Sequence, residues 1–414
     1  MNTERFGLLG EKLGHSFSPM IHRELGGYDY DLIELRPEEL PEFLKKKEFR
    51  GVNVTIPYKQ AVIPYLDRLD GAAAKIGSVN TIVREKDGSL TGYNTDAAGF
   101  RAMISQSGIS PEGRKCLVFG SGGASKTAVF CLKEAGARQV VVISRRGADN
   151  YENLDRHRDA EILVNCTPVG MYPNNGALAA DPWDFPEAAA ALDLIYNPAR
   201  TAFLLSAERM GIAAAGGLGM LTAQAAEACS LFTGKNIPAS ETERVTRLIR
   251  SQTENIVLIG MPGCGKTTVG MKLAEITGKK LLDTDRMIEE RNGGELCGDI
   301  IRRLGEDEFR RMETEAVKEA GKCSGCVIAT GGGIVTRKEN LDALRQNGIL
   351  VHIDRPREEL PATGDRPLSE TRELLEKRYR ERAPLYEAWR DFAVWDASPE
   401  KMAKTILERE EKGK

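Results

Sequence analysis

The stretch Gly260-Met-Pro-Gly-Cys-Gly-Lys-Thr-Thr268 decides the fold of the C-terminal half, because it fits the phosphate-binding-loop pattern G-x-x-x-x-G-K-[ST]. The apolar run 256–259 before it predicts a buried parallel strand. After it, Val269, Leu273 and Ile276 recur at helical spacing. The loop therefore joins a strand to a helix, as in enzymes that bind nucleoside triphosphates.

The chemistry of this loop follows from its glycines and its lysine. The glycines let successive backbone N–H groups face one concavity, to which the helix N-terminus adds partial positive charge. Lys266 is placed to reach the β- and γ-phosphates of ATP, and Thr267 to ligate Mg²⁺. The expected nucleotide-binding residues are Gly263, Gly265, Lys266, Thr267 and Thr268.

The composition describes an ordinary globular protein of two or three domains: 414 residues, 41% hydrophobic and 29% charged. A net charge of −3 and the lack of a basic stripe argue against nucleic-acid binding. The N-terminus lacks a signal pattern and no apolar run reaches membrane-spanning length, so we expect a cytoplasmic protein without a membrane partner.

The eight cysteines are scattered through expected strands and helices, which favours reduced core residues over a disulfide framework. Cys323 and Cys326 form the one pair at redox or metal-ligand spacing. The pair runs into a buried-looking strand, and none of the four histidines lies at ligand spacing from it, so the metal or redox alternative is disfavoured.

Polar clusters in the first ~100 residues suggest a site on an α/β lobe. Pro19 holds Ser18 extended, so Ser16 and Ser18 face the same side, where they can grip a carboxylate or hydroxyl. The run 51–56 predicts a strand, and Pro57 suits the first turn of a helix, which places Lys59 at a strand-to-helix junction. A third cluster holds Asn80 and, beyond a hairpin signal, Asp96. Spacing alone favours a plain surface ion pair for such a lysine and aspartate.

A dinucleotide-binding unit is predicted downstream. The strand 116–119 leads into a glycine loop and a helix over 124–134, and a second strand, 139–143, closes a βαβ unit. Arg145 and Arg146 follow that strand, at the position where an NAD site would have an acidic residue. Two cations there suit the 2′-phosphate of NADP. The alternative is that both arginines are merely solvated at the end of the strand. The expected cofactor residues are Gly120, Gly122, Gly123, Ala124, Ser144, Arg145 and Arg146.

The C-terminal half carries further candidates. Asp283 and Asp285 lie two apart on one expected strand face, where they can serve a metal-bound water and a substrate hydroxyl. On a helix from residue 306, Arg310 and Glu313 are spaced as a pair that alone would be a surface bridge. The strand 327–330 runs into a triple glycine that a ligand can approach closely. Two more arginines follow: Arg366 lies in a polar loop, and Arg382 is expected just after a helix.

Four motifs, taken in order, resemble the substrate lobe of shikimate dehydrogenase: Ser16-Phe-Ser-Pro19, Asn53-Val-Thr-Ile-Pro-Tyr-Lys59, Val79-Asn-Thr81 and Asn94-Thr-Asp96. The resemblance implies that Lys59 and Asp96 are the catalytic pair. It also implies which residues hold the carboxylate and hydroxyls of the ring: Ser16, Ser18, Thr55, Asn80 and Gln224.

The later motifs 165–171, 193–198 and 219–221 resemble the cofactor side of the same family. They imply cofactor contacts at Thr167 and Gly219 and a substrate contact at Tyr196. The 18 residues between Arg146 and Asn165 are too few for the helix and strand usual in the family, so we expect a trimmed Rossmann domain. Ser144 and Arg146 also depart from the family pattern, whereas Arg145 matches it.

The chain from Asn255 onward resembles shikimate kinase. The resemblance implies that Asp285 receives the ring hydroxyl and that Arg310 and Arg382 bind the carboxylate. It further implies that Gly332 and Gly333 back the ring, that Arg366 closes from a lid, and that Thr267 and Asp283 hold the metal. The lid segment is short and lacks a second arginine.

Together these motifs predict an α/β protein: a two-lobed dehydrogenase with a trimmed Rossmann domain, followed by a P-loop kinase with a parallel sheet. The expected parts are a substrate lobe (1–102), an NADP domain (103–218), return helices and a linker (219–253, with 251–254 as the linker) and the kinase (254–414). The resemblance implies NADPH-dependent reduction of 3-dehydroshikimate and ATP-dependent phosphorylation of the hydroxyl so made.

Three alternatives remain beside this interpretation. The first half could act on quinate or use NAD, which the two serines and the arginine pair disfavour. A non-catalytic metabolite sensor would lose Lys59, Asp96, Lys266 or Asp285, and all four are present.

The expected partners are small molecules, and the sequence leaves the oligomeric state open.

Overall fold

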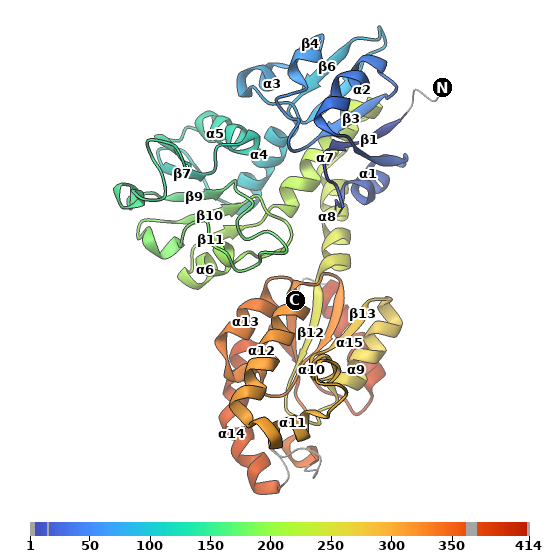
Figure 1. Cartoon of the computed structure of the whole chain (residues 1–414), viewed down its shortest axis with the longest axis vertical. Helices are drawn as coiled ribbons and strands as arrows, with labels where there is room; N and C mark the ends of the chain where they lie inside the picture. Colours follow the sequence, from blue (N-terminus) through green and yellow to red (C-terminus); the bar gives the residue numbers. More distant parts are fainter. Residues whose placement is uncertain (1–4, 15, 362–370, 412–414) are drawn as a thin grey trace. The chain divides into compact units, whose positions relative to one another are not determined.

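The computed structural model of the chain describes residues 5–14, 16–361 and 371–411. It divides into two compact units, Met1–Ile249 and Arg250–Lys414. Each unit is built from α-helices around predominantly parallel sheets (Figure 1).

The first lobe of unit 1 contains a six-stranded mixed sheet in the order β2-β1-β3-β5-β6-β4. Strands β1, β2 and β3 are parallel, whereas β5 and β6 form the hairpin predicted from the turn residues near Gly88. The strands are β1 (Phe6–Gly10), β2 (Tyr30–Glu34), β3 (Gly51–Val54), β4 (Arg68–Leu69), β5 (Thr81–Arg84) and β6 (Leu90–Tyr93). The helices are α1 (Ser18–Gly26), α2 (Leu40–Lys46) and α3 (Gly71–Ile76), with 3₁₀ turns at Pro37–Glu39 and Ile63–Tyr65.

The helix expected to begin at Pro57 is absent, and that prediction was wrong. Residues 57–62 form consecutive turns after β3. The Lys59 carbonyl accepts the N–H of Val79 at 2.8 Å, so it is not available to an i→i+4 helical bond. This bond to the loop before β5 holds Lys59 beside the third polar cluster, which contains Asn80.

The second lobe of unit 1 contains five parallel strands in the order β11-β10-β9-β7-β8. Helices α4 and α5 pack on one face of this sheet, and α6 with two 3₁₀ turns packs on the other (Figure 1). The strands are β7 (Lys115–Phe119), β8 (Gln139–Ile143), β9 (Ile162–Asn165), β10 (Ala190–Asp193) and β11 (Ala213–Ala215). The helices are α4 (Asp96–Ser107), α5 (Gly123–Glu134) and α6 (Ala202–Met210), with 3₁₀ turns at Leu154–His157 and Pro182–Asp184.

The short segment between Arg146 and Asn165 keeps its strand, contrary to the expectation that both helix and strand would be lost. A single 3₁₀ turn, Leu154–His157, takes the place of a helix, and β9 still pairs with β7 and β10. A hydrogen bond between His157 Nε2 and Asp149 Oδ1, 2.9 Å apart, spans this connection. The trimming therefore removes a helix while the parallel sheet remains continuous.

Helices α7 (Leu218–Thr233) and α8 (Ala239–Thr253) follow β11. Helix α7 packs against α4 and α1, and Val245 and Ile249 of α8 are buried against Ile21 and Ala225. The predicted linker 251–254 adjoins the boundary between the two units, and its first three residues are the end of α8. Helix α8 extends to Thr253 because the N–H of Glu254 still bonds to the Arg250 carbonyl and Lys279 Nζ donates to the carbonyls of Ser251 and Glu254.

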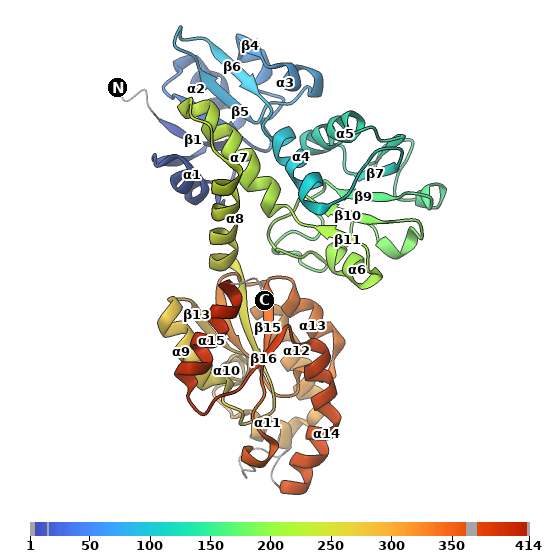
Figure 2. The same ribbon diagram turned by 180° about the vertical axis from the view of Figure 1, so that it is seen from behind.

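Unit 2 contains five parallel strands in the order β13-β14-β12-β15-β16. Figure 2 shows α9 and α15 on one side of this sheet and α12 and α13 on the other. The strands are β12 (Asn255–Ile259), β13 (Lys280–Asp283), β14 (Cys326–Ala329), β15 (Gly348–Ile353) and β16 (Phe392–Val394). The helices are α9 (Lys266–Thr277), α10 (Thr284–Arg291), α11 (Cys297–Leu304), α12 (Glu306–Lys322), α13 (Lys338–Arg345), α14 (Arg372–Trp389) and α15 (Pro399–Glu411), with 3₁₀ turns at Ile334–Thr336 and Arg357–Glu359.

Two site residues of unit 2 lie in other elements than the sequence predicted. Asp285 is in the first turn of α10 and not on a strand, because Asp283 ends β13 and caps α10 by accepting the N–H groups of Asp285 and Arg286. Arg382 lies inside α14 and not after a helix. The helix continues through Pro384 because Tyr386 and Trp389 beyond it are buried in the core.

The eight cysteines are free thiols, and Cys326 is buried at the start of β14. No helix within the described part of the chain is long and apolar enough to cross a membrane.

Candidate active sites

A lysine and an aspartate meet in the first lobe. Lys59 Nζ lies 2.5 Å from Asp96 Oδ2, and their side chains are 18% and 11% exposed. The pair is therefore mostly shielded from water, unlike the surface bridge that spacing alone favours. Asp96 is the first residue of α4, where the helix dipole stabilises a carboxylate.

The pair borders a cavity of about 220 Å³ between the two lobes of unit 1. All the ring-binding residues expected from the sequence line it: Ser16, Ser18, Thr55, Asn80, Tyr196 and Gln224. Ser16 and Ser18 lie at the start of α1, where the Ser18 N–H donates to Ser16 Oγ at 3.2 Å. Tyr196 follows β10 and its ring lies 5.3 Å from that of Phe17. The sequence thus located residues that the fold brings together from both lobes.

Asn80 connects the pair of Lys59 and Asp96 to the rest of the cavity. Its amide Nδ2 donates to Asp96 Oδ1 at 2.9 Å and to Thr95 Oγ1 at 3.0 Å, and it lies 3.4 Å from Gln224 Oε1. Its Oδ1 accepts the N–H of Thr95 at 2.7 Å. These bonds fix the carboxylate of Asp96 toward Lys59.

Asn53 was not among the expected site residues, although it lines the cavity and is 5% exposed. It accepts the hydroxyl of Tyr30 at 2.7 Å and donates to Thr81 Oγ1 at 2.9 Å. Strand alternation could have predicted Asn53, because Asn53 and the expected site residue Thr55 are two positions apart and share one face of the extended chain. Apolar lining residues such as Leu194, Met220 and Leu221 carry no such signal.

The glycine loop after β7 adjoins this cavity. Gly120 has φ +106°, and a Cβ on it would lie 3.1 Å from Thr167 and 3.2 Å from the Cys166 carbonyl. A Cβ on Gly123 would lie 3.0 Å from Ser78 Oγ and 3.6 Å from Lys59 Cδ. The loop therefore approaches Lys59, and Ala124 of α5 lines the cavity itself. Gly122 is the N-cap of α5, so the first N–H groups of this helix face the loop.

Ser144, Arg145 and Arg146 lie at the same edge of the sheet as the glycine loop, because Phe119 of β7 pairs with Ile143 of β8. Both arginines are exposed, and no carboxylate within the described residues forms an ion pair with either. Unpaired cations at this edge fit a phosphate group on the ribose of a dinucleotide.

Thr167 and Gly219 occupy different surroundings. Thr167 follows β9 beside Gly120, and its N–H and hydroxyl both donate to Asn165 Oδ1, at 3.0 and 2.7 Å. Gly219 lies in the first turn of α7, where a Cβ would meet Gln106 of α4 at 2.5 Å. Its neighbour Gly217 lines the cavity instead.

The phosphate-binding loop of unit 2 has the backbone that its glycines allow. Gly260, Gly263 and Gly265 have φ values of +147°, +77° and +100°. Lys266 is 8% exposed, and its Nζ donates to the carbonyls of Gly260 and Met261 at 2.9 and 3.0 Å. The ammonium group therefore lies within the loop, ahead of the N-terminus of α9, whose first turn also carries the exposed Thr268.

Thr267 and Asp283 come together at the end of β13. Thr267 Oγ1 donates to Asp283 Oδ2 at 2.8 Å. A hydroxyl and a carboxylate beside a phosphate-binding loop fit Mg²⁺, which takes one or two protein ligands and completes its shell with phosphates and water. No group of three or more His, Cys, Asp and Glu side chains within the described residues could hold a metal alone.

Asp285 and Glu313 flank the first glycine of the triple glycine. A Cβ on Gly331 would clash with Glu313 Oε1 and would lie 2.7 Å from Asp285 Oδ1. Burial, together with the nearby Glu313 and Asp283, raises the pKa of Asp285 to about 7. A carboxylate with a raised pKa is a competent acceptor for a hydroxyl proton near neutral pH.

Arg310 and Glu313 form a buried ion pair, so the alternative of a surface bridge is wrong. Arg310 Nη1 donates to Glu313 Oε2 at 2.7 Å, and the two residues are 7% and 1% exposed. The guanidinium occupies the space beside Gly333, where a Cβ would clash with Nη1. Glycine is required here because any side chain would displace Arg310.

Arg382 reaches the same region from α14. Its Nη1 donates to the Gly332 carbonyl at 3.0 Å, and Tyr386 Oη donates to that carbonyl at 2.5 Å. Among the residues that the structure describes, Arg382 Nη2 and Glu313 Oε1 are buried without hydrogen-bond partners, as expected of groups that a polar ligand would bind. Arg366, expected to close over the phosphates, lies outside the described residues.

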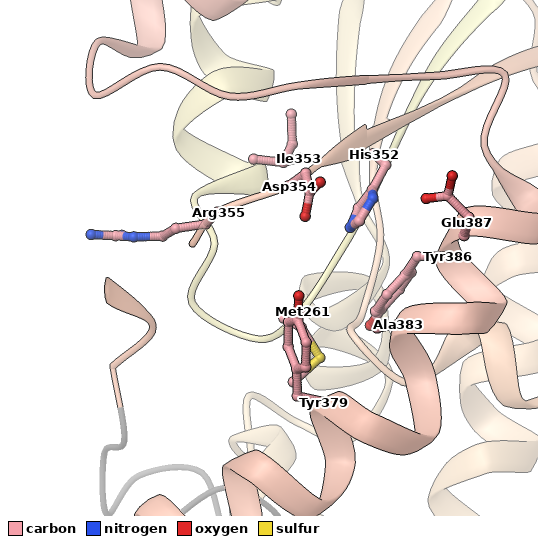
Figure 3. Close-up of a pocket in the computed structure, with 9 residues that line it drawn as sticks. All are labelled: Met261, His352, Ile353, Asp354, Arg355, Tyr379, Ala383, Tyr386 and Glu387. Carbon is pink, nitrogen blue, oxygen red and sulfur yellow. The ribbon is translucent and has the colours of Figure 1, made fainter. Parts of the chain in front are cut away.

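A second cavity, of about 100 Å³, lies between β15, α14 and Met261 of the phosphate-binding loop (Figure 3). His352 stacks on Tyr386 there, with ring centroids 5.1 Å apart. Burial lowers the pKa of His352 to about 4, so this imidazole is neutral. The stack packs the phosphate-binding loop against the helix that carries Arg382.

The fold and the two sites define a dinucleotide-dependent oxidoreductase joined to a P-loop phosphotransferase. Residues 8–82 match the family model described as shikimate dehydrogenase substrate binding domain. An NADP(+)-type shikimate dehydrogenase of Moorella thermoacetica is 36% identical over 276 residues, which is 59% of this chain and 93% of that protein. The chain belongs to the shikimate dehydrogenase family. Its residues 262–411 match the family model of shikimate kinase, so the enzyme carries that second domain.

Solved structures resemble the same part of the chain. The shikimate 5-dehydrogenase of Thermus thermophilus, in complex with NADP(H) and shikimate, is 37% identical with a TM-score of 0.54, covering 59% of this chain and 99% of that one. A chorismate mutase/shikimate 5-dehydrogenase fusion protein of Clostridium acetobutylicum is 34% identical with a TM-score of 0.57, covering 60% and 98%. The expected family of the first half is thereby confirmed.

Proposed function

We propose that the chain catalyses two consecutive steps: NADPH-dependent reduction of 3-dehydroshikimate to shikimate, then ATP-dependent phosphorylation of the hydroxyl group formed. The names of the relatives and of the two family models support shikimate as the shared compound. The two reactions act on the same oxygen atom, first as a carbonyl and then as a hydroxyl.

In the first reaction NADPH supplies a hydride to the carbonyl carbon of the substrate. Lys59 donates a proton to the oxygen as negative charge develops on it, and Asp96, held by Asn80, keeps the ammonium in place. Ser16 and Ser18 bind the carboxylate of the ring, and Thr55 and Gln224 bind its hydroxyls. Arg145 binds the 2′-phosphate of the cofactor.

In the second reaction Asp285 accepts the hydroxyl proton as the oxygen attacks the γ-phosphate of ATP. Arg310 and Arg382 bind the substrate carboxylate, and the backbone of Gly332 and Gly333 supports the ring. Lys266 and the loop N–H groups neutralise the phosphates, with Mg²⁺ held by Thr267 and Asp283 supplying further positive charge. The chain's contribution is therefore positioning and charge neutralisation.

The main support for the first reaction is that Gly123 lies close to Lys59, because this places the proposed proton donor and the dinucleotide-binding loop at one cavity. The test uses shikimate as a common substrate for the purified chain. We expect NADP⁺ reduction in the absence of ATP, and ADP formation in the presence of Mg·ATP without NADP⁺. Shikimate that supported only one of these activities would contradict the proposal.

A further inference from the structure

Arg378 lies on α14 one turn before Arg382, outside the set of site residues assigned so far. Its Nη1 and Nη2 donate to Glu306 Oε1 and Oε2, at 3.2 and 3.1 Å. The two oxygens of one carboxylate thus receive the two ends of one guanidinium, which is the geometry of a strong, orienting ion pair. The side chain of Arg378 is only 19% exposed.

Glu306 also contacts Arg310, the arginine proposed to bind the substrate carboxylate. It is the first residue of α12, and its Oε1 also accepts Arg310 Nη2 at 3.1 Å. Arg310 is held by Glu313 through its other terminal nitrogen and packs in the space beside Gly333. A chain of ion pairs therefore runs from α14 through α12 to the guanidinium that faces the triple glycine.

The charges of this cluster are unequal. The arginines at 310, 378 and 382 contribute three positive charges, and Glu306 and Glu313 contribute two negative charges. These five side chains leave one positive charge over, beside the Nη2 of Arg382, which has no hydrogen-bond partner among the described residues. Burial, and the neighbouring cations Arg310 and Arg378, lower the pKa of Arg382.

We propose that Arg378 is a positioning residue for the carboxylate of the kinase substrate: it holds Glu306, and Glu306 in turn orients Arg310. Without Arg378, Glu306 would have Arg310 as its remaining cationic partner and would compete with the substrate carboxylate for it. The inference rests on the proposed function, since it takes a monocarboxylate as the kinase substrate.

The test measures steady-state kinase kinetics of the full-length chain and its variants with shikimate and Mg·ATP. For Arg378→Gln we expect KM for shikimate to rise about tenfold, as for the loss of one charge-assisted contact. We expect kcat and KM for ATP to stay within about twofold, because the phosphate-binding loop is not touched. Arg378→Lys should restore part of the affinity. Arg380→Gln, an exposed arginine on the same helix, is the matched control and should behave as wild type.

A double-mutant comparison separates positioning from direct binding. If Arg378 acts through Glu306, Arg378→Gln should add no further rise in KM to a chain that already carries Glu306→Gln. An equal rise in both backgrounds, an unchanged KM in the single variant, or a joint loss of kcat and ATP affinity would each overturn the inference. If the wild-type kinase did not phosphorylate shikimate at all, the proposed function would be contradicted, and the inference about Arg378 would lose its basis.

Discussion

Lys59 and Asp96 lie 37 positions apart in the chain, yet their charged atoms are 2.5 Å apart and mostly shielded from water. The turns after β3 carry the lysine and the first turn of α4 carries the aspartate, to which Asn80 donates a hydrogen bond inside the same cavity. The first prediction concerns the loss of this lysine.

Lys59→Ala should lower oxidoreductase turnover by about 10²–10⁴-fold, the range typical of general acid–base groups. Kinase turnover of the same chain should stay within about threefold, because Lys59 belongs to the other compact unit. NADPH formation from shikimate and ADP formation are measured on the same preparation. Lys86→Ala, in the exposed β5–β6 turn, is the control. If the Lys59 variant kept its dehydrogenase activity, Lys59 would not be the proton donor.

Arg145→Ala should abolish most of a preference for NADP⁺ over NAD⁺. A charge-assisted contact to the 2′-phosphate is worth about 1.5–3 kcal/mol, or roughly 10–150-fold in kcat/KM. The measurement is the ratio of kcat/KM for the two cofactors, with Arg156→Ala, an exposed arginine of the neighbouring 3₁₀ turn, as control. Equal use of both cofactors by the wild type would refute the assignment of residues 144–146 as a phosphate site.

Asp285→Asn should lower the kinase kcat by about 10²-fold or more while leaving KM for ATP nearly unchanged. The amide keeps the shape of the side chain and cannot accept the hydroxyl proton. Shikimate oxidation by the same variant should equal that of wild type, which serves as the internal control. A kcat that stayed near the wild-type value would exclude Asp285 as the proton acceptor.

Asp193 should make the stability of the dehydrogenase unit depend on pH. Burial raises its pKa from 3.8 to about 6, although Thr201, Ile195 and Asn165 donate hydrogen bonds to it. Because the folded pKa lies above the unfolded value, its stabilising contribution is complete below about pH 4 and is lost as pH rises through 6. Relative to Asp193→Asn, the wild type should therefore gain about 1–2 kcal/mol between pH 7 and pH 5.

Thermal unfolding at the two pH values measures this difference. Asp184→Asn, an exposed aspartate nearby in sequence, is the control and should show no such change. If the wild type and the Asp193 variant shifted in parallel between pH 7 and pH 5, the buried carboxylate would not titrate as described.

The two halves should fold separately as the polypeptides 1–253 and 250–414. The first keeps the whole of α8, whose Val245 and Ile249 are buried in unit 1. The second keeps the Thr253 carbonyl, which accepts the Gly325 N–H at 2.7 Å, and the contacts of Lys279. Each should show cooperative unfolding and turn over its own substrate. An insoluble or inactive half would show that it depends on the other.

Local sequence patterns predicted most of the elements that carry chemistry. The strand, glycine loop and helix around Lys266 have a fixed pattern, because the phosphate-binding backbone requires glycine at defined positions. The cavity residues of the first lobe were predicted from motifs that the fold gathers at one place. The phosphate-binding loop depends on short-range geometry, which sequence spacing encodes. The cavity residues, in contrast, were implied by the resemblance to shikimate dehydrogenase.

Features that depend on tertiary contacts were not predictable. Lys59 is held by a bond to Val79 and not by a helix, and no local pattern shows that bond. Arg310 and Glu313 have the spacing of an ordinary surface pair, and only their packing beside Gly331 and Gly333 makes them buried. Arg382 was expected after a helix, but α14 continues through Pro384, because the packing of Tyr386 outweighs the hydrogen bond that proline cannot donate.

The most direct test of the two-step account is a single reaction of the purified chain with labelled 3-dehydroshikimate, NADPH and Mg·ATP, followed by product analysis over time. We predict that labelled shikimate appears transiently, that shikimate 3-phosphate accumulates as NADPH and ATP are consumed in equal amounts, and that added unlabelled shikimate dilutes the label in the product. Omitting NADPH should abolish both products. Phosphorylated product formed without NADPH, or shikimate that accumulated without being phosphorylated, would contradict the account.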